Sequence, residues 1–305
     1  MTLRHIEVFR AVMQTGSMTE AARRLHTSQP QVSRLVGQLE AIVRFPLFER
    51  HGTRLSPTLD GKRFLEDVER TFVGLAGLEV AAANILSFGG QRLSLAAMPR
   101  LAGGVLTRAV VEFKRAFPES LVTIQSGAAA SINTWVSAGL CDLGLAILYG
   151  DDVPGLRTET LYGMDCVLVL PKGHRLLGQQ RVHARDLADE AFISFPVGSA
   201  PRERIDQVFA ASGVRPRTVL ESDLGASVCA LVGAGLGVSV INPLAARQEQ
   251  RTSGVEVRAF QPAIAVRLAM LFPPDAPGSR LLDAFAARLR EAVRQELRGL
   301  APGRE

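Results

Sequence analysis

Apolar residues recur at helical spacing near the start of the chain, and two short amphipathic patterns follow each other between positions 17 and 43. The polar turn His26-Thr27-Ser28 separates them. Ser17 and Glu20 have the spacing of a capping box that begins the first helix, and Ser28 and Gln31 repeat this spacing before the second. The pattern therefore predicts two helices joined by a tight turn.

The second helix of this pair has one apolar and one polar face. Its apolar stripe is Val32, Leu35, Val36 and Leu39. A proline fits the first turn, because the N–H that it lacks would have no intrahelical partner there. The opposite face carries short hydrogen-bonding groups and one guanidinium, which suit base edges and phosphates in a major groove. We therefore predict that this helix contacts double-stranded DNA through Ser28, Gln29, Pro30, Gln31, Ser33, Arg34 and Gln38.

The segment that follows, residues 45–55, has the pattern of a hairpin. Apolar residues anchor it, Gly52 permits a turn, and Arg50 and Arg54 flank the tip. We predict a wing whose arginines reach phosphates or the minor groove. Residues 1–58 contain eight arginines and four acidic residues, a net charge of +4 against +5 for the whole chain. The alternative is a helical bundle with a basic, solvated surface.

This segment resembles the N-terminal domain of LysR-type transcriptional regulators. The stretches LRHIEVFRAVM, GSMTEAARRLHTSQPQVSRLV, LFER and LSPT follow the family's order. One departure is Val43-Arg44-Phe45, where the family carries a leucine-glycine turn at the end of the recognition helix. The resemblance covers essentially the whole chain. It implies an α/β protein with an N-terminal winged helix-turn-helix, a long linker helix and a two-lobed effector domain similar to periplasmic solute-binding proteins.

Residues 59–88 contain no proline and read as one long helix. Leu65, Phe72 and Leu86 fall on one heptad position, and Val68, Leu75 and Ala82 on the next, although Glu79 interrupts the seam. A weak coiled coil of this kind needs a partner; the alternative is a helix packed on its own domain. The resemblance implies a homodimer that assembles further to a homotetramer on a dyad operator. Ser87-Phe88-Gly89-Gly90 is expected to end the helix as a hinge.

From Leu93 onward strands and helices alternate. Strands are expected at 93–98, 121–125 and 143–148 with helices at 101–117 and 131–138 between them, an order that implies a parallel sheet. The second set is expected to have strands at 166–171, 192–195, 219–221, 238–241, 255–260 and 265–272, with helices at 202–212, 223–234 and 279–297. We therefore expect a DNA-binding domain over 1–58, a linker over 59–88 and an effector domain over 91–305. The resemblance implies that lobe I holds 91–162 and 265–300, that lobe II holds 163–264, and that the chain crosses near 161–165 and 261–265.

Ligands of such sheets bind outside the carboxyl ends of the strands. In this region Arg100 and Arg202 are candidate forks for carboxylates, and Asp223 is a candidate partner for an ammonium group. Helix starts near 101, 131 and 223 offer N–H groups to anions. Together these groups favour a small zwitterion or dicarboxylic amino acid; the alternative is solvated arginines and an aspartate that caps a helix. The candidate effector-binding residues are Met98, Pro99, Arg100, Leu101, Gly127, Ala128, Ser131, Pro196, Ser199, Arg202, Ser222 and Asp223.

Two longer stretches refine the resemblance. Residues 221–246, ESDLGASVCALVGAGLGVSVINPLAA, resemble the LysR subgroup that controls diaminopimelate decarboxylase in response to diaminopimelate. AAMPRLAGGVL looks more like the related opine-responsive regulators. Both subgroups imply an effector derived from an amino acid, with diaminopimelate and lysine synthesis as the first candidates and opine or arginine catabolism as the alternative.

Catalytic and cofactor motifs are missing from the sequence. Gly198-Ser199-Ala200 is not a nucleophile elbow, and residues 150–155 have P-loop spacing without the lysine and hydroxyl that must follow. Gly233, Gly235 and Gly237 do not have dinucleotide-binding spacing, and the five histidines form no H-x-x-x-H pair. We therefore expect no enzyme activity, no cofactor and no metal site.

The remaining composition favours a cytoplasmic protein. Three cysteines, each in an apolar run, suit buried reduced thiols better than disulfides. Charged residues interrupt the N-terminal apolar stretch, so no signal peptide is expected. Residues 224–246 carry no charge, but glycines and Pro243 interrupt them, so no membrane span is expected. A solute-binding protein acting in transport is the rival interpretation; it predicts an export signal and no basic head.

Overall fold

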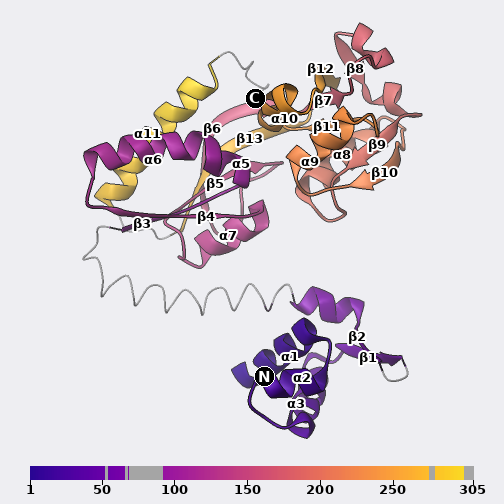
Figure 1. Ribbon diagram of the computed structural model, residues 1–305, viewed down its shortest axis with the longest axis vertical. Coiled ribbons are helices and arrows are strands. Elements are labelled where there is room, and N and C mark those ends of the chain that lie inside the picture. Colours follow the sequence, from indigo (N-terminus) through magenta and orange to yellow (C-terminus); the bar gives the residue numbers. More distant parts are fainter. Residues whose placement is uncertain (52–53, 66–67, 69–91, 275–278, 299–305) are drawn as a thin grey trace. The chain divides into compact units, whose positions relative to one another are not determined.

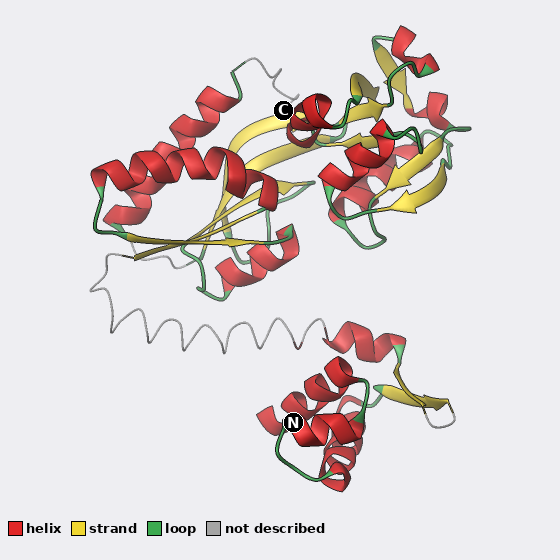
Figure 2. Cartoon of the chain, viewed as in Figure 1, coloured by secondary structure: helices red, strands yellow, loops and turns green. Residues whose placement is uncertain are grey.

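The computed structural model of the chain describes residues 1–51, 54–65, 68, 92–274 and 279–298. The chain divides into two compact units, Met1–Ala83 and Asn84–Glu305. The first is a helical head with a small hairpin, and the second is a two-lobed α/β region (Figures 1 and 2). The predicted class, a winged helix-turn-helix followed by a two-lobed α/β domain, is confirmed.

The head is built from three helices and one hairpin: α1 (Leu3–Thr15), α2 (Met18–Arg24), α3 (Gln29–Val43), β1 (Phe48–His51) and β2 (Arg54–Pro57). Ser17 and Ser28 are the N-caps of α2 and α3, and each Oγ accepts a hydrogen bond from the N–H three residues later at 3.4 Å. In a full capping box the side chain of the third helical residue also accepts the N–H of the N-cap residue. In both helices this side chain makes another contact instead. The Glu20 carboxylate pairs with Arg23, and the Gln31 amide with Arg34.

Two apolar clusters hold the head together. The first joins the buried faces of the three helices through Val8, Ala11, Val12, Ala21, Ala22, Val32, Leu35 and Val36. In the second, Phe9 packs beside Leu39 and Leu47, with its ring 5.8 Å from that of Phe48. The predicted apolar stripe of the second helix is therefore confirmed.

Residues 59–65 and 68 are helical and begin the expected linker. Val68 is buried in the second cluster of the head, and Leu65 packs against the same cluster. The assignment of Val68 to a dimer seam was therefore wrong, because an aromatic-rich surface of its own domain already covers it. Phe72, Leu75, Glu79, Ala82, Leu86 and the expected hinge 87–90 lie outside the described residues.

Lobe I contains a five-stranded sheet in the order β4-β3-β5-β13-β6. Its strands are β3 (Arg92–Ala97), β4 (Leu121–Ser126), β5 (Leu143–Leu148), β6 (Arg157–Asp165) and β13 (Ala265–Phe272). The first three are parallel, as expected, whereas β13 runs antiparallel to both of its neighbours. The lobe I sheet is therefore mixed rather than purely parallel, because the chain returns from lobe II in the opposite direction.

Helices cover both faces of this sheet (Figure 1). Helices α6 (Thr107–Ala116) and α11 (Arg280–Glu296) share one face, where Phe113 and Phe285 meet at 5.5 Å in the same apolar core as Leu145. Helix α7 (Ala129–Ser137) packs on the other face through Ile132 and Val136. Burial on both sides explains why β5 is apolar at nearly every position.

The single helix expected over 101–117 is divided. It consists of α5 (Pro99–Leu101), the π-helical segment η1 (Ala102–Leu106) and α6. Gly104 has φ −111° and ψ −109°, far from helical values. Two adjacent glycines, Gly103 and Gly104, give the backbone the freedom to break there.

Lobe II contains a four-stranded sheet in the order β11-β7-β12-β8 and a parallel pair, β9 and β10, linked to it by a bridge between Phe192 and Val238. The strands are β7 (Val167–Leu170), β8 (Arg181–His183), β9 (Ala191–Ser194), β10 (Arg217–Glu221), β11 (Ser239–Ile241) and β12 (Glu256–Gln261). The helices are α8 (Ala200–Ala211), α9 (Gly225–Gly233), α10 (Pro243–Thr252) and the 3-10 turns η2 (Arg175–Gly178) and η3 (Ala184–Leu187). The sequence analysis missed β6, β8, α10 and both 3-10 turns.

The chain crosses between the lobes twice, from β6 to β7 and from β12 to β13 (Figure 1). Strand β6 remains in the lobe I sheet up to Asp165, which pairs with Ala265. The next residue, Cys166, donates its N–H to the carbonyl of Ile264 at 2.9 Å and so ties the two crossings together. The second crossing lies within the expected residues 261–265, whereas the first comes at Cys166, directly after the expected 161–165, so lobe I extends to Asp165 rather than to 162.

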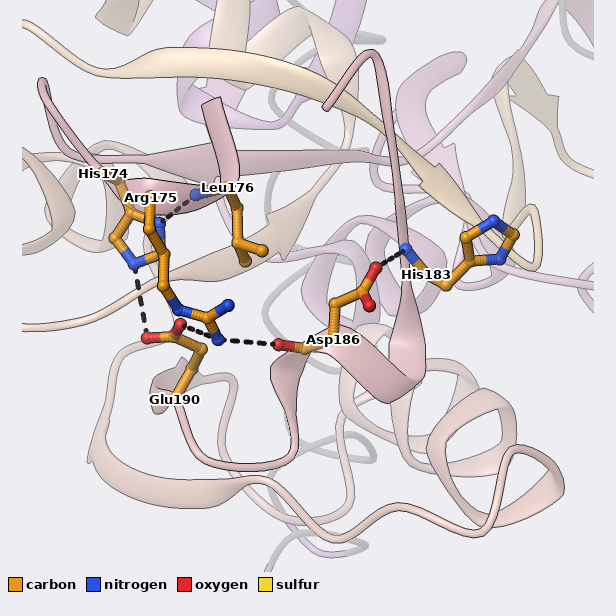
Figure 3. Close-up of polar contacts among 6 residues, drawn as sticks. All are labelled: His174, Arg175, Leu176, His183, Asp186 and Glu190. Carbon is orange, nitrogen blue, oxygen red and sulfur yellow. Dashed lines mark hydrogen bonds and ion pairs between the residues drawn. The ribbon is translucent and has the colours of Figure 1, made fainter. Parts of the chain in front are cut away.

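A polar cluster holds the loops at the outer part of lobe II (Figure 3). The Glu190 carboxylate lies 3.3 Å from His174 Nε2 and 2.8 Å from Arg175. His174 also caps η2, because its Nδ1 accepts the N–H of Leu176. His174 is therefore engaged in a structural contact.

No helix in the part of the chain that the structure describes combines the length and apolarity needed to cross a bilayer. Cys141, Cys166 and Cys229 are all buried and unpaired, as expected. Burial raises the pKa of each thiol to about 12, so the three side chains behave as small apolar groups.

Candidate DNA-binding and effector-binding sites

Helix α3 presents its polar face to solvent because its apolar face is fixed in the head core. Ser28, Gln29, Pro30, Arg34 and Gln38 are exposed, and Gln31 and Ser33 are half-buried. All of the predicted contacts on this helix are therefore accessible on the head. The Ser28 hydroxyl is occupied as the N-cap, which gives this residue a structural task as well.

Two of the glutamines of α3, Gln31 and Gln38, each contact a neighbouring side chain. Arg34 Nη2 donates to Gln31 Oε1 at 2.9 Å. His5, from α1, lies with its Nε2 3.3 Å from Gln38 Oε1. The sequence analysis did not include His5, because the pattern of α1 gave no sign that it would reach α3.

The hairpin has the expected form, with Arg50 opposite Leu55 and His51 opposite Arg54. Arg50 is the last residue but one of β1 and Arg54 is the first of β2. The expected turn at Gly52 lies outside the described residues. Glu40 fastens the hairpin to the end of α3: its Oε1 accepts the N–H of Leu47 at 2.7 Å and of Phe48 at 3.1 Å. Glu40 was also missed, since the acidic residue appeared as part of a solvated helix face.

Helix α3 ends at Arg44, the position where the sequence departs from the family pattern. Arg44 has φ 65° and ψ 27°, the left-handed conformation that glycine adopts most readily. Arg44 therefore adopts the conformation of a glycine C-cap although it carries a side chain. Arg44 is exposed, so its side chain does not strain the core.

The candidate effector-binding residues lie in four segments, here called the walls, that follow the ends of parallel strands. Residues 98–101 follow β3 and residues 127–131 follow β4, and the N–H of Gly127 binds the carbonyl of Ala97 at 3.2 Å. Residues 195–202 follow β9 and residues 222–224 follow β10, with the N–H of Ser222 bound to the carbonyl of Ser194 at 3.0 Å. The walls therefore form two pairs, one in each lobe.

Both candidate arginine forks already have carboxylate partners. Arg100 Nη2 lies 3.1 Å from Glu249 of α10, in the other lobe. The buried Glu249 carboxylate also accepts the hydroxyls of Thr252 at 2.7 Å and Ser253 at 2.9 Å. Arg202 bonds both Asp206 and Glu221 at 2.7 Å, and these bonds raise the pKa of its guanidinium.

The remaining wall residues are held mostly by local contacts. Ser199 Oγ donates to the carbonyl of Pro196 at 2.7 Å, and Ser222 Oγ accepts the N–H of Leu224 at 3.3 Å. Asp223 is exposed and caps no helix, because Leu224 is the N-cap of α9. The alternative reading of Asp223 as a capping residue was therefore wrong, and the helices expected to begin near 101, 131 and 223 begin at Pro99, Ala129 and Gly225.

In lobe I the walls are shaped by close packing. A Cβ added to Gly127 would lie 2.7 Å from the Trp135 ring, so only glycine fits between the strand end and α7. Ala128 is the N-cap of α7 and Ser131 is half-buried beside it. Met98 is half-buried, its Sδ accepts the N–H of Ile147 at 3.4 Å, and Pro99 is exposed.

A cavity of about 550 Å³ lies between α5, η1, α10 and the end of α11. Arg100 and Leu101 line it together with Arg108, Leu244, Arg247 and Leu268, among others. The other predicted wall residues do not line this cavity. Arg100 is therefore placed toward this cavity and Glu249, a position that sequence reasoning did not foresee.

The junction of the lobes contains a half-buried tyrosine that was not among the predicted site residues. Tyr149, directly after β5, hydrogen-bonds Asn242 and Cys166, and its burial raises the pKa of its hydroxyl well above the usual value. Asn242 caps α10 in lobe II, and Cys166 lies on the first crossing. The Tyr149 hydroxyl therefore joins the end of a lobe I strand to the first crossing and to lobe II.

Comparison with known proteins gives matches to both units. Residues 3–62 match the model of the bacterial regulatory helix-turn-helix proteins of the lysR family, and residues 89–294 match the LysR substrate binding domain. The transcriptional activator protein LysR of Escherichia coli (strain K12) is 38% identical over 95% of this chain and 93% of its own length. The octopine catabolism/uptake operon regulatory protein OccR of Rhizobium meliloti is 32% identical, over 94% of each chain.

A solved structure shows the same fold. Full-length CbnR complexed with its target DNA has a TM-score of 0.57 and 23% identity, covering 96% of this chain and 100% of that one. The expected resemblance is thus confirmed by both domain models and by relatives that are transcriptional regulators. This chain belongs to the LysR family of DNA-binding transcriptional regulators.

Proposed function

We propose that this regulator binds a dyad operator through α3 and the wing, and that a small amino-acid-derived effector bound between its lobes controls that binding. The exposed polar face of α3 carries the first part of the proposal. Its predicted contacts stay Ser28, Gln29, Pro30, Gln31, Ser33, Arg34 and Gln38, with Arg50 and Arg54 on the wing. A homodimer that assembles to a homotetramer would present paired heads to paired half-sites.

The arrangement of strand ends supports the second part. Two pairs of parallel strands, one in each lobe, end in the wall segments, and the lobes are joined by two short crossings. Ligands of α/β sheets bind at such strand ends. An effector that touched both pairs of walls would fix the angle between the lobes, and in the complete oligomer this would alter the spacing of the heads and the bend of the DNA.

The relatives favour an amino-acid-derived effector. The resemblance of residues 221–246 to the LysR subgroup favours lysine synthesis as the controlled pathway and diaminopimelate as the effector, and the 38% identity with LysR of Escherichia coli agrees with this choice. The similarity to OccR, an octopine catabolism/uptake operon regulatory protein, supports opine catabolism as the alternative. We propose the domain boundaries 1–58, 59–88 and 91–305 for this function. The basic head and the matching helix-turn-helix model argue against a solute-binding protein acting in transport.

Calorimetric titration of the full chain with meso-diaminopimelate, lysine, arginine and octopine tests the effector. Saturable binding of meso-diaminopimelate alone supports the lysine-pathway assignment. Binding of octopine alone supports the alternative, a regulator of opine catabolism. Asp223→Asn is expected to weaken binding, whereas Asp189→Asn, which changes an exposed aspartate away from the walls, is the matched control. Equal affinities for the two variants would remove Asp223 from the site.

DNA binding is tested separately on the upstream region of the gene that encodes this chain. Arg34→Ala and Ser33→Ala are expected to abolish the specific footprint without changing the oligomeric state measured by light scattering. Arg50→Ala and Arg54→Ala are expected to lower the salt dependence of binding by about one unit for each lost phosphate contact. A footprint that survives Arg34→Ala would contradict the role of α3.

A further inference from the structure

Three of the candidate DNA contacts form one ridge along α3. Gln31, Arg34 and Gln38 are spaced at i, i+3 and i+7, and all three lie on the polar side of the helix. Seven residues of helix rise by about 10 Å, or roughly three base-pair steps. The ridge is therefore long enough to meet several consecutive bases in a major groove.

The carbonyl oxygen of each glutamine on this ridge is already occupied. Arg34 Nη2 donates to Gln31 Oε1 at 2.9 Å, and His5 Nε2 lies 3.3 Å from Gln38 Oε1. A carboxamide accepts on its oxygen side and donates on its nitrogen side. Each oxygen keeps a second lone pair, but its bond turns it toward its protein partner and leaves the NH₂ group of each glutamine for a base edge. Arg34 offers only donors in any orientation.

The orientation of Gln38 is fixed by the protonation of His5. Its Nδ1 accepts the backbone N–H of Thr2 at 3.2 Å and lies 2.5 Å from the Thr2 hydroxyl. An accepting Nδ1 carries no proton, so the ring proton lies on Nε2 and points at Gln38. If the amide of Gln38 turned over, its NH₂ group would face this N–H, and two donors would oppose each other.

We propose that Gln31, Arg34 and Gln38 form a donor-rich surface that prefers acceptor-rich base edges, above all N7 and O6 of guanine, and that His5 sets this preference at Gln38. Guanine presents two neighbouring acceptors in the major groove. The usual bidentate contact of glutamine with adenine requires its oxygen to accept from N6, and cytosine likewise presents a donor. This inference rests on the proposed contact between α3 and DNA.

Gln29 and Ser33 are also accessible, but they lie beside the ridge rather than on it. Neither side chain makes a hydrogen bond that would fix its polarity within the described residues 1–51. They remain able to accept from adenine or cytosine. The expected guanine preference therefore applies to the base pairs that face the ridge and not to the whole operator.

His5→Glu and His5→Gln form a matched pair of variants. Position 5 is the N3 position of α1, where both residues complete a capping box with Thr2. Glutamine can accept from Thr2 through its oxygen and still donate to Gln38 through its nitrogen, which keeps the polarity of the ridge. Glutamate only accepts, so it favours the reversed amide and turns the Gln38 oxygen toward the DNA.

The experiment is selection of bound sites from a random-sequence duplex pool with the full chain. Wild type and His5→Gln are expected to select guanine at the same positions. His5→Glu is expected to bind every sequence more weakly, because it adds a negative charge, and to replace guanine by adenine or cytosine at one position only. Replacing the selected guanine by 7-deazaguanine, which lacks the N7 acceptor, is expected to weaken wild-type binding by about tenfold.

The contrary outcomes separate the inference from the proposed function. Two results would overturn the donor-rich surface. One is that the wild type selects adenine or cytosine at every position that Arg34→Ala alters; the other is that wild type and His5→Glu show the same base preference. Two other results would overturn the proposed contact of α3 with bases, and with it this inference. One is that Arg34→Ala selects the same sites as the wild type; the other is that the selection enriches no sequence. Circular dichroism of both His5 variants checks that α1 remains folded.

Discussion

Replacing Glu40 by alanine is expected to lower the free energy of unfolding of the head by about 3 kcal/mol. Its Oε1 accepts two backbone N–H groups, those of Leu47 and Phe48, at 2.7 and 3.1 Å. Hydrogen bonds to a charged group contribute about 1.5–3 kcal/mol each, and water reaching the freed N–H groups offsets part of the loss. The wing would also lose its attachment to α3, so DNA binding is expected to weaken.

The aromatic residues allow the two units to be followed separately. The single tryptophan, Trp135, and both tyrosines, Tyr149 and Tyr162, lie in the second unit. In a urea titration, tryptophan fluorescence therefore reports on that unit, whereas far-ultraviolet circular dichroism reports on both. Glu40→Ala is expected to lower the urea midpoint of the head, which is seen by circular dichroism alone. The midpoint of the second unit, seen by tryptophan fluorescence, is expected to stay the same.

Two further variants identify the cause of the shift. Glu40→Gln keeps an acceptor of the same shape, so it is expected to cost only about 1 kcal/mol. Glu20→Ala removes an exposed carboxylate of the same helical head, paired with Arg23 at 3.2 Å, and is expected to cost less than about 1 kcal/mol. Equal shifts for Glu40→Ala and Glu20→Ala would refute the idea that Glu40 holds the wing.

Three other changes have expected directions. Arg44→Gly relieves a left-handed residue at φ 65° and is expected to stabilise the head by about 1 kcal/mol; a lower melting temperature would show that Arg44 makes a compensating contact. Gly127→Ala places a Cβ 2.7 Å from the Trp135 ring and is expected to cost about 1–3 kcal/mol and change the tryptophan emission; an unchanged spectrum would contradict the packing. Hydrogen bonds from Arg290 lower the pKa of Glu159 below its ordinary 4.5. The pair therefore stabilises lobe I above pH 4.5, and this stabilisation is lost as the pH falls through the lowered pKa. Glu159→Gln is expected to flatten the dependence of lobe I stability on pH in acid titrations.

Local patterns predicted the elements whose burial follows one simple period. The 3.6-residue stripe of α3 matches the one face of this helix that is buried, and the apolar run of β5 matches a strand that is buried on both faces. The hairpin was predictable because Gly52 lies between two short runs. Strand β6 was missed since its sequence, RTETLYGMD, is polar at positions that an edge strand can expose to water.

Contacts between distant segments were beyond the reach of such patterns. Arg100 meets Glu249 and His5 meets Gln38 because tertiary packing brings their helices together, over separations of 149 and 33 residues. The same limit applies to Gly104, whose break in the helix depends on how η1 fits against α11. The sequence therefore located the DNA-binding face well, whereas the partners that fix its side chains emerged only from the fold.

The ion pair between Arg100 and Glu249 constrains the kind of effector that the lobes can accept. An effector carboxylate that bound Arg100 would compete with Glu249 for the guanidinium, and if it displaced Glu249 it would leave that buried carboxylate with only the hydroxyls of Thr252 and Ser253. Uncompensated buried charges are costly, typically several kcal/mol. Arg202 is similarly engaged by Asp206 and Glu221. Among the described residues, the backbone N–H groups at the start of α7 are paired with no carboxylate side chain, and they lie beside Gly127. If the proposed effector bound its carboxylate there, it would gain from the helix dipole without breaking either ion pair, so we expect this wall to tolerate an effector carboxylate better than the two arginines do.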